Sequence, residues 1–188
     1  MYGAPEFQLA RLAVADLGRY YGLPTWGYAG HSDSCLFDEQ AAADATVSVL
    51  TALQSGTNLV HDVGYLEAGL SCSPEMIVFT CELIEMLRRF QKGFEIDKEN
   101  LALEVIHTVG PGGNFLAEEH TIRHFREYWQ PTLFSRQRFD VWKEEGAATL
   151  GKRLREKTVA LLDQAEGTPL PPSQSEEVEY ILELKELR

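Results

Sequence analysis

The stretch that decides the fold reads Asn58-Leu59-Val60-His61-Asp62-Val63-Gly64-Tyr65-Leu66. A short apolar run ends in a histidine and an aspartate, and a glycine and a tyrosine follow directly. This order is typical of an interior barrel strand whose tip and following loop are used for chemistry. The same two side chains could instead cap the turn after an ordinary strand, and spacing alone slightly favours that structural role.

The composition indicates a globular chain with an acidic surface. Its 188 residues are 44% hydrophobic and 24% charged, which suits one domain with a substantial core. The formal net charge of −12 argues against nucleic acid, because no basic stripe is present to neutralise phosphates. An acidic surface would suit a cationic substrate or a basic partner.

Cysteine usage and hydropathy indicate a cytoplasmic protein. Cys35, Cys72 and Cys81 are odd in number and lack CxxC spacing, so we expect reduced thiols rather than disulfides or a structural zinc site. We find no apolar run long enough to span a membrane and no signal peptide, so we expect neither membrane insertion nor export.

The first half of the chain alternates helices with two short strands. Periodicity and capping residues predict helices over Gln8–Tyr21, Glu39–Gln54 and Pro74–Phe90, the last one capped by Ser73. The expected strands are Leu23–Ala29 and Asn58–Val63. A helix between two short strands makes a βαβ unit, so we expect the strands to be parallel neighbours.

The second half reads as helical, and we expect no strand after Val63. Gly110–Asn114 is the clearest helix breaker, and a proline-rich linker is expected over Gly167–Ser175. The expected helices are Glu99–Val109, Glu118–Tyr128, Phe139–Ala165 and Ser175–Leu187. We therefore divide the domain into a partial α/β barrel over residues 1–93 and a helical region over residues 94–188.

Two parallel strands cannot bury both faces of a sheet. The simplest account is that this chain is the C-terminal part of a larger α/β barrel. We expect its unpaired strand edges to be covered by a second copy of the chain or by the remaining part of the barrel.

Several separated blocks of sequence together resemble one known family. They are Gly3–Glu6, Leu17–Pro24, Gly30–Ser34, Asp38–Ala41, Gly56–Glu67, Val109–Leu116, Trp129–Pro131 and Leu133–Arg136. In this order they resemble the C-terminal portion of the trimethylamine methyltransferase family. The resemblance implies a TIM-like (β/α)8 barrel with a helix-rich C-terminal half.

The resemblance also implies a reaction and a partner. Members of the family move a methyl group from a methylated amine to the Co(I) of a corrinoid carried by a separate protein. Trimethylamine-specific members carry pyrrolysine in the segment that here reads Tyr28 to Ser32, and this chain has none. The departure points to members that act on quaternary amines such as glycine betaine, whose nitrogen already leaves as a neutral amine.

Side chains at the expected strand ends are the candidate site. We assign His61 and Asp62 to the catalytic centre, and expect the following residues to bind substrate: Tyr28, His31, Asp33, Tyr65 and Glu67. Aromatic faces and carboxylates hold a quaternary cation without hydration. Each residue also has a structural alternative, because Trp26 and Tyr28 could simply pack on one strand face, and Asp33 and Glu67 could cap turns.

His61 is the residue to which we give the main role. A neutral imidazole can donate an N–H to a substrate carboxylate and so hold the acid end of a betaine. Direct pairing of His61 with Asp62 is not expected, because neighbours on a strand point to opposite faces.

His120 and His124 lie four residues apart on an expected helix, a spacing that could ligate a metal ion. No third ligand stands out nearby in the sequence, so we expect a solvated helix face and no metal site.

Two other classes of function remain open. One is a different barrel enzyme, a lyase or hydrolase that uses His61 and Asp62 as acid and base. The other is a non-catalytic remnant that serves as an interaction module.

Overall fold

The computed structural model describes residues 1–165, 167 and 171–186 of the chain. The chain divides into two compact units, residues 1–158 and 159–188, and the division falls inside helix α8 (Leu150–Asp163). The first unit mixes α and β structure and contains all the candidate site residues. Our boundary near residue 93 stays a prediction.

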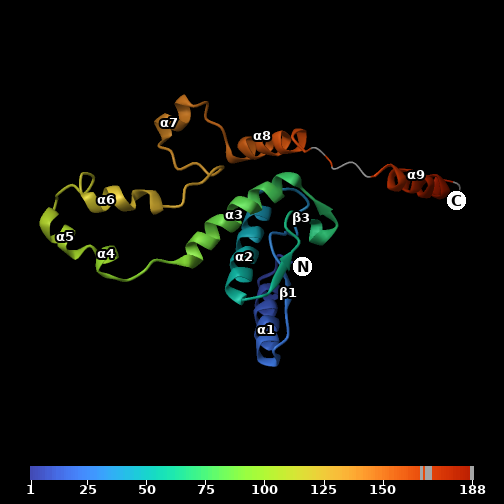
Figure 1. Ribbon diagram of the computed structural model, residues 1–188, viewed down its shortest axis with the longest axis horizontal. Coiled ribbons are helices and arrows are strands. Elements are labelled where there is room, and N and C mark those ends of the chain that lie inside the picture. The colour runs from blue at the N-terminus through green and yellow to red at the C-terminus, as the bar shows by residue number, and fades with distance from the viewer. Residues whose placement is uncertain (166, 168–170, 187–188) are drawn as a thin grey trace. The chain divides into compact units, whose positions relative to one another are not determined.

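The first unit contains a parallel pair of strands, of which β1 is labelled in Figure 1. β1 (Trp26–Tyr28) lies beside β2 (Leu59–His61), with Trp26 opposite Leu59 and Tyr28 opposite His61. The predicted parallel βαβ unit is therefore confirmed. Both strands are shorter than expected: β1 begins only at Trp26, and Gly30 and Asp62, just beyond the strand ends, adopt left-handed φ angles of 73° and 74°.

Three capped helices accompany this pair, and the predicted capping residues are confirmed. α1 (Pro5–Tyr21) ends at Gly22, and α2 (Glu39–Ser55) ends at Gly56, both with left-handed backbone. The Ser73 side chain accepts the backbone N–H of Met76 and begins α3 (Pro74–Lys92).

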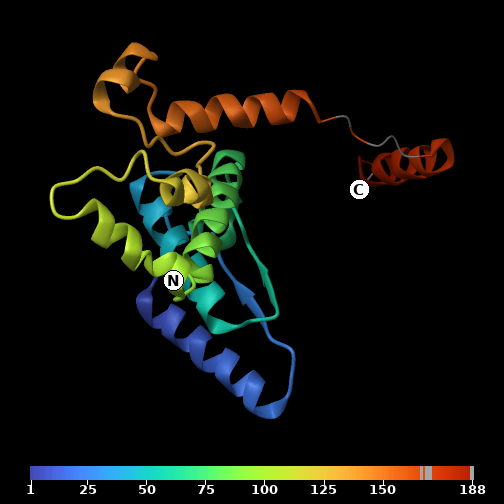
Figure 2. The ribbon, with the colours of Figure 1, turned by 60° about the vertical axis from the view of Figure 1, so that its left-hand side comes forward.

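The core lies between α2 and α3, which run side by side in Figure 2. α2 contributes a column of small residues, which lets the two helices and β1 approach closely. α3 contributes larger side chains at helical spacing. The buried residues of these two helices in the core are Ala41, Ala45, Val49, Ala52, Met76, Phe79, Leu83 and Leu87.

A small hairpin follows β2, so the expectation of no strand after Val63 was wrong. β3 (Tyr65–Leu66) pairs antiparallel with β4 (Ser71–Cys72), and a 3-10 turn, η1 (Glu67–Gly69), joins them. Strands of two residues have no periodicity to detect in a sequence. Main-chain hydrogen bonds define them instead.

The second half is helix-rich, as predicted, but its helices are shorter than expected. They are α4 (Lys98–Leu101), α5 (Leu103–Val109), α6 (Glu119–His124) with a 3-10 turn η2 (Phe125–Glu127), α7 (Phe139–Glu144), α8 and α9 (Pro172–Glu186). The single helix expected over Phe139–Ala165 was wrong, because Gly146 and Ala147 adopt φ angles of 94° and 51°. Residues 168–170 of the expected linker and Leu187 of the expected last helix lie outside the described residues.

A buried carboxylate fastens the segment after η2 to α3. Glu82 is only 5% exposed, and its Oε1 accepts the backbone N–H groups of Thr132 and Leu133, both at 2.8 Å. Its Oε2 accepts the Thr132 hydroxyl at 2.5 Å. This connection holds Phe134 against Phe79 of the core, with ring centroids 5.7 Å apart.

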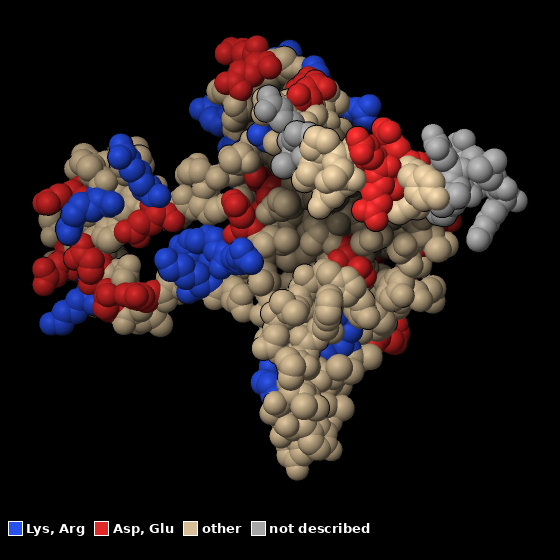
Figure 3. Space-filling view, turned by 45° about the vertical axis from the view of Figure 1, so that its right-hand side comes forward, with Lys and Arg blue, Asp and Glu red and all other residues tan. Residues whose placement is uncertain are grey.

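Apolar side chains remain on the outside of the first unit. Around α1 and the turn after it, Leu17, Tyr20, Tyr21 and Leu23 are each more than half exposed. Figure 3 shows that the lower part of this face carries few charged side chains. Among the described residues, we find no helix with the length and apolar character needed to cross a membrane.

Candidate functional site

The candidate site lies where β1 and β2 end. Both strands are parallel, so their carboxyl ends meet at one edge of the sheet, together with the loops that follow. The loops are joined by main-chain hydrogen bonds from Ala29 to His61, from Gly64 to Gly30 and from Ser32 to Tyr65, at 2.8–3.0 Å. The two loops therefore form one connected platform.

Aromatic rings cover one face of this strand pair. The Tyr28 and His61 ring centroids are 4.6 Å apart, and those of Trp26 and His61 are 5.3 Å apart, both edge to face. The prediction that Trp26 and Tyr28 share a face is confirmed. Trp26 is 66% exposed, so the face is open at this ring.

His61 and Asp62 pair directly, so our expectation that they point apart was wrong. His61 Nδ1 lies 2.5 Å from Asp62 Oδ1. The alternation of side chains holds only while the backbone is extended, and Asp62 has left the strand with its φ of 74°. The pair is partly open to solvent, with side-chain exposures of 41% and 25%.

His31 lies buried beside this face. It is 3% exposed, and neither ring nitrogen has a hydrogen-bond partner among the described residues. Tyr2 and Phe7 flank it, with ring centroids 5.6 Å and 6.4 Å away. Burial, followed by the nearby Arg11 charge, lowers the pKa of His31 below its ordinary value, so the ring is held in its neutral form.

Asp33 binds backbone in this structure. Its Oδ1 accepts the N–H of Tyr2 at 2.8 Å, and its Oδ2 accepts the N–H of Gly3 at 2.9 Å. Asp33 thereby holds the N-terminal segment, and with it the Tyr2 ring, over the strand ends. Its structural role is to support the site, and its assignment to substrate binding stays a prediction.

Tyr65 and Glu67 lie in the hairpin, apart from the aromatic face. Tyr65 pairs with Cys72 across the hairpin and has no ring partner within the described part of the chain. Glu67 is exposed, adopts a φ of 51°, and forms no ion pair among the described side chains. Aromatic contacts connect Tyr28, His31 and His61, and Asp62 pairs with His61, whereas the assignment of Tyr65 and Glu67 to substrate binding stays a prediction.

Sequence reasoning missed the contribution of the first helix. Tyr2 and Phe7 complete the aromatic cluster, and the Arg11 guanidinium carbon lies 6.0 Å from the rings of both Phe7 and Tyr28. Arg11 Nε is buried and has no hydrogen-bond partner in the described structure. The signal was the aromatic pair on either side of the Gly3–Glu6 block, at the point where the helix enters.

An α/β unit with aromatic and titratable side chains at the carboxyl ends of parallel strands belongs to the α/β class that binds ligands at this edge. The family model described as trimethylamine methyltransferase matches residues 1–186. The chain therefore belongs to the trimethylamine methyltransferase family.

Curated relatives support the same assignment. The chain is 33% identical over 183 residues to a glycine betaine methyltransferase of Desulfitobacterium hafniense (strain Y51), covering 96% of this chain and 37% of the relative. It is 32% identical to a trimethylamine methyltransferase of D. hafniense (strain DSM 10664 / DCB-2), covering 90% and 34%. It is 35% identical to a trimethylamine methyltransferase of Methanosarcina barkeri (strain Fusaro / DSM 804), covering 89% and 34%. The chain thus spans about a third of the length of these relatives.

Proposed function

We propose that this chain is part of a corrinoid-dependent methyltransferase that takes a methyl group from a quaternary amine such as glycine betaine. The observation that carries the proposal is the cluster of Trp26, Tyr28 and His61 at the ends of two parallel strands. Membership in the family supports the reaction class. The absence of pyrrolysine from the sequence supports a quaternary substrate.

The aromatic face suits the cationic end of such a substrate. Ring faces attract a quaternary ammonium electrostatically and do not hydrate it. Asp62, beside His61, adds a negative charge near this face. We propose that these groups hold the methyl-bearing nitrogen towards a partner protein, whose Co(I) corrinoid accepts the methyl group while the amine leaves uncharged.

Arg11 and His61 suit the acid end of a betaine. Both lie against the Tyr28 ring, Arg11 at 6.0 Å and His61 at 4.6 Å between ring centroids. Burial lowers the pKa of Arg11, while Tyr28 and Asp62 act in the opposite direction, and a guanidinium stays charged in either case. Its unpaired Nε is a donor for which a substrate carboxylate would provide an acceptor.

The proposed setting is a TIM-like barrel in the cytoplasm. In such a barrel β1 and β2 would be neighbouring strands, and α2 would be an outer helix. Within the described residues each strand pairs only with the other, so both outer edges are available for further strands or for another chain.

The test replaces His61 in the protein that contains this chain. We expect His61→Ala to reduce methyl transfer from glycine betaine to Co(I) cobalamin by about 30- to 1000-fold. The reason is that the substrate carboxylate would lose the polar partner that His61 provides, which costs roughly 2–4 kcal/mol. The loss should appear mainly as weaker substrate binding. Asp62→Asn should matter less if Asp62 only shapes the loop, and equally if it faces the ammonium.

His107→Ala is the matched control, since His107 is exposed on α5. Spectroscopic detection of methylcobalamin measures the rate. Full activity in His61→Ala would remove this residue from the site and would leave the proposal without its main structural support.

The close His61–Asp62 contact favours a second candidate, an acid–base reaction of a lyase or hydrolase. A carboxylate that accepts from one ring nitrogen orients the imidazole for proton transfer at the other. The two candidates differ in their pH profiles. If His61 only orients the substrate, the reaction rate should depend weakly on pH. If His61 and Asp62 transfer protons, the rate should follow a bell-shaped pH profile and should not require a corrinoid.

A further inference from the structure

A second cluster of titratable side chains lies outside the candidate methyl-transfer site. His120 and His124 lie one turn apart on α6, and their ring centroids are 4.3 Å apart. The sequence offered no third ligand for this pair. The structure supplies Glu99 of α4, and one ligand atom from each of the three residues lies within 4.8 Å of the others.

The hydrogen bonds around the two imidazoles match those of metal-binding histidines. A ligating histidine usually donates its second ring N–H to a carbonyl or carboxylate, which fixes the tautomer. His120 Nε2 lies 2.8 Å from the Glu99 carbonyl oxygen, and His124 Nδ1 lies 2.8 Å from Glu127 Oε1. One nitrogen of each ring is thereby oriented, which leaves His120 Nδ1 and His124 Nε2 as the ligand atoms.

Glu99 adds the negative charge that a divalent cation requires. Its Oε1 lies 3.1 Å from His124 Nε2 and 2.8 Å from Arg123 Nη1. The side chains are exposed or half-buried, and their ligand atoms, now within 4.8 Å of one another, need to close by up to about 1.4 Å to reach the spacing of about 3.4 Å in a tetrahedral site with bonds near 2.0–2.2 Å.

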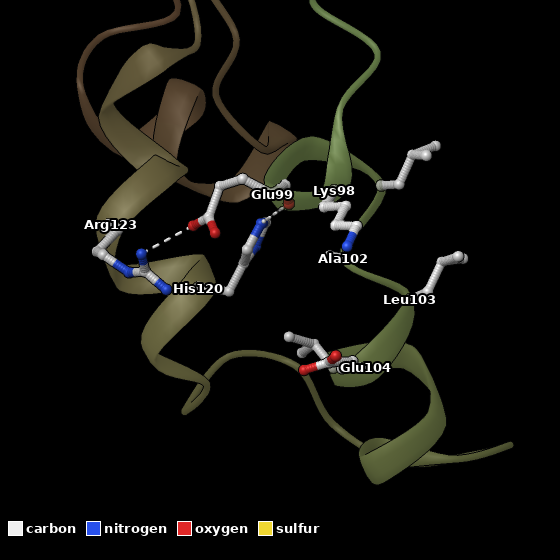
Figure 4. A pocket seen from close by; sticks show the side chains of 9 residues that line it. Lys98, Glu99, Ala102, Leu103, Glu104, His120 and Arg123 are labelled. Atoms are coloured by element: carbon white, nitrogen blue, oxygen red, sulfur yellow. Dashed lines mark hydrogen bonds and ion pairs between the residues drawn. The ribbon is translucent and has the colours of Figure 1, made fainter.

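Open space adjoins the cluster on two sides. Glu99, His120 and Arg123 line a cavity of 560 Å³ between α4, α5 and α6 (Figure 4). His120, His124 and Glu127 line a second one of 330 Å³. A metal ion held by the three residues would therefore keep a position open to water.

We propose that Glu99, His120 and His124 form a binding site for a divalent metal ion of the Zn²⁺ type. Two imidazoles and one carboxylate are a common ligand set for zinc with an open fourth position. The ion would cross-link α4 to α6. The segment between these helices, which includes the Gly110–Asn114 turn, would then form a loop whose two ends are held by the metal. This site is independent of the proposed methyl transfer.

Cobalt titration of the full chain tests the proposal. Co²⁺ is a spectroscopic substitute for Zn²⁺, and we expect one ion per chain with visible absorption typical of low coordination number, displaced by Zn²⁺. His120→Ala, His124→Ala and Glu99→Gln should each weaken binding by at least about tenfold. His107→Ala, on the neighbouring helix α5, should bind as the unaltered chain does.

Three exposed cysteines provide the alternative source of ligands, and the spectrum separates the two cases. Thiolate coordination adds strong near-ultraviolet absorption that imidazole and carboxylate do not give. Circular dichroism checks that each variant is folded. Absence of saturable binding, or binding that the three variants leave unchanged, would overturn the proposal.

Discussion

At the scale of single residues, His31 makes the folding stability of the chain depend on pH. Its ring is buried against those of Tyr2 and Phe7, with no partner for either nitrogen among the described residues. Its pKa in the folded chain lies below the ordinary value of 6.5, mainly because of burial. The unfolded chain therefore binds a proton on His31 more readily than the folded chain does. The free energy of unfolding is unaffected by His31 above its unfolded pKa, and it decreases as the pH falls from the unfolded pKa towards the lower folded pKa.

We expect His31→Phe to make the chain less sensitive to acid. A phenyl ring keeps the contacts with Tyr2 and Phe7 but has no proton to gain. Between pH 7 and 5, urea unfolding of the unaltered chain should show an extra loss of stability of at most about 1.4 kcal/mol per pH unit. The variant should lack that loss.

His107→Phe is the control, since His107 is exposed. An identical pH dependence in His31→Phe and the unaltered chain would show that His31 titrates normally.

The sequence predicted which residues gather at the strand ends but not how they pair. Tyr28, His31 and His61 followed from their positions after apolar runs. The contact between His61 and Asp62 depends on one backbone angle, the φ of 74° at Asp62, and a non-glycine residue rarely adopts such an angle. No pattern of residue types encodes that conformation.

At the scale of elements, Glu82 determines how the second half attaches to α3. Burial raises the pKa of this carboxyl, but the hydrogen bonds from Thr132, Leu133 and Phe134 outweigh burial, and the net pKa is lowered. The contribution of Glu82 to stability is therefore present above the unfolded pKa near 4.5 and is lost as the pH falls through the folded pKa.

We expect Glu82→Ala to destabilise the first unit by about 3 kcal/mol, because three part-buried backbone N–H groups lose their acceptor together. Glu82→Gln should cost about 1 kcal/mol, since its amide oxygen still accepts but without the charge. Chemical denaturation at pH 7 measures both.

Glu85→Ala, on an exposed position of the same helix, should stay within about 0.5 kcal/mol of the unaltered chain. Equal effects of Glu82→Ala and Glu85→Ala would contradict the structural role of Glu82.

Helices with capping residues were predictable, and short elements were not. Ser73, Gly22 and Gly56 predicted the ends of helices within a few residues, whereas the N-cap role of Asp38 was not predicted. The single helix expected over Phe139–Ala165 was wrong because Gly146, with a φ of 94°, ends the helical backbone. Periodicity continues across such a break, so periodicity alone does not locate it.

At the scale of the whole molecule, the strand pair leaves apolar surface uncovered. Trp26, Leu59 and Val60 are 66%, 60% and 42% exposed, and within the described chain each strand has one unpaired edge. Strand edges and apolar faces of this kind pair with other chains.

We expect the isolated chain to associate at tens of micromolar, and light scattering should report a mass above 21.1 kDa. Leu59→Lys should shift the equilibrium towards the monomer, because a charge at an exposed strand opposes pairing. Val47→Lys, on the exposed side of α2, should leave the mass unchanged. A stable monomer of the unaltered chain would contradict this expectation.

Sequence identified the family at this scale but not the contact between α4 and α6. The separated motif blocks appear in order along the chain, and they carried the resemblance. Glu99 meets His120 and His124 only because the chain turns back through Gly110–Asn114. A contact between residues so far apart along the chain depends on tertiary structure, which spacing within one helix does not report.

The hydrogen bonds between the two site loops also have a kinetic consequence. The amides of Ala29, Gly64 and Ser32 all bond across the same seam. They exchange with solvent deuterium only when that seam opens, so their exchange rates should be similar. The loop after β1 and the loop after β2 would then open as one unit, and neither strand end would become accessible without the other.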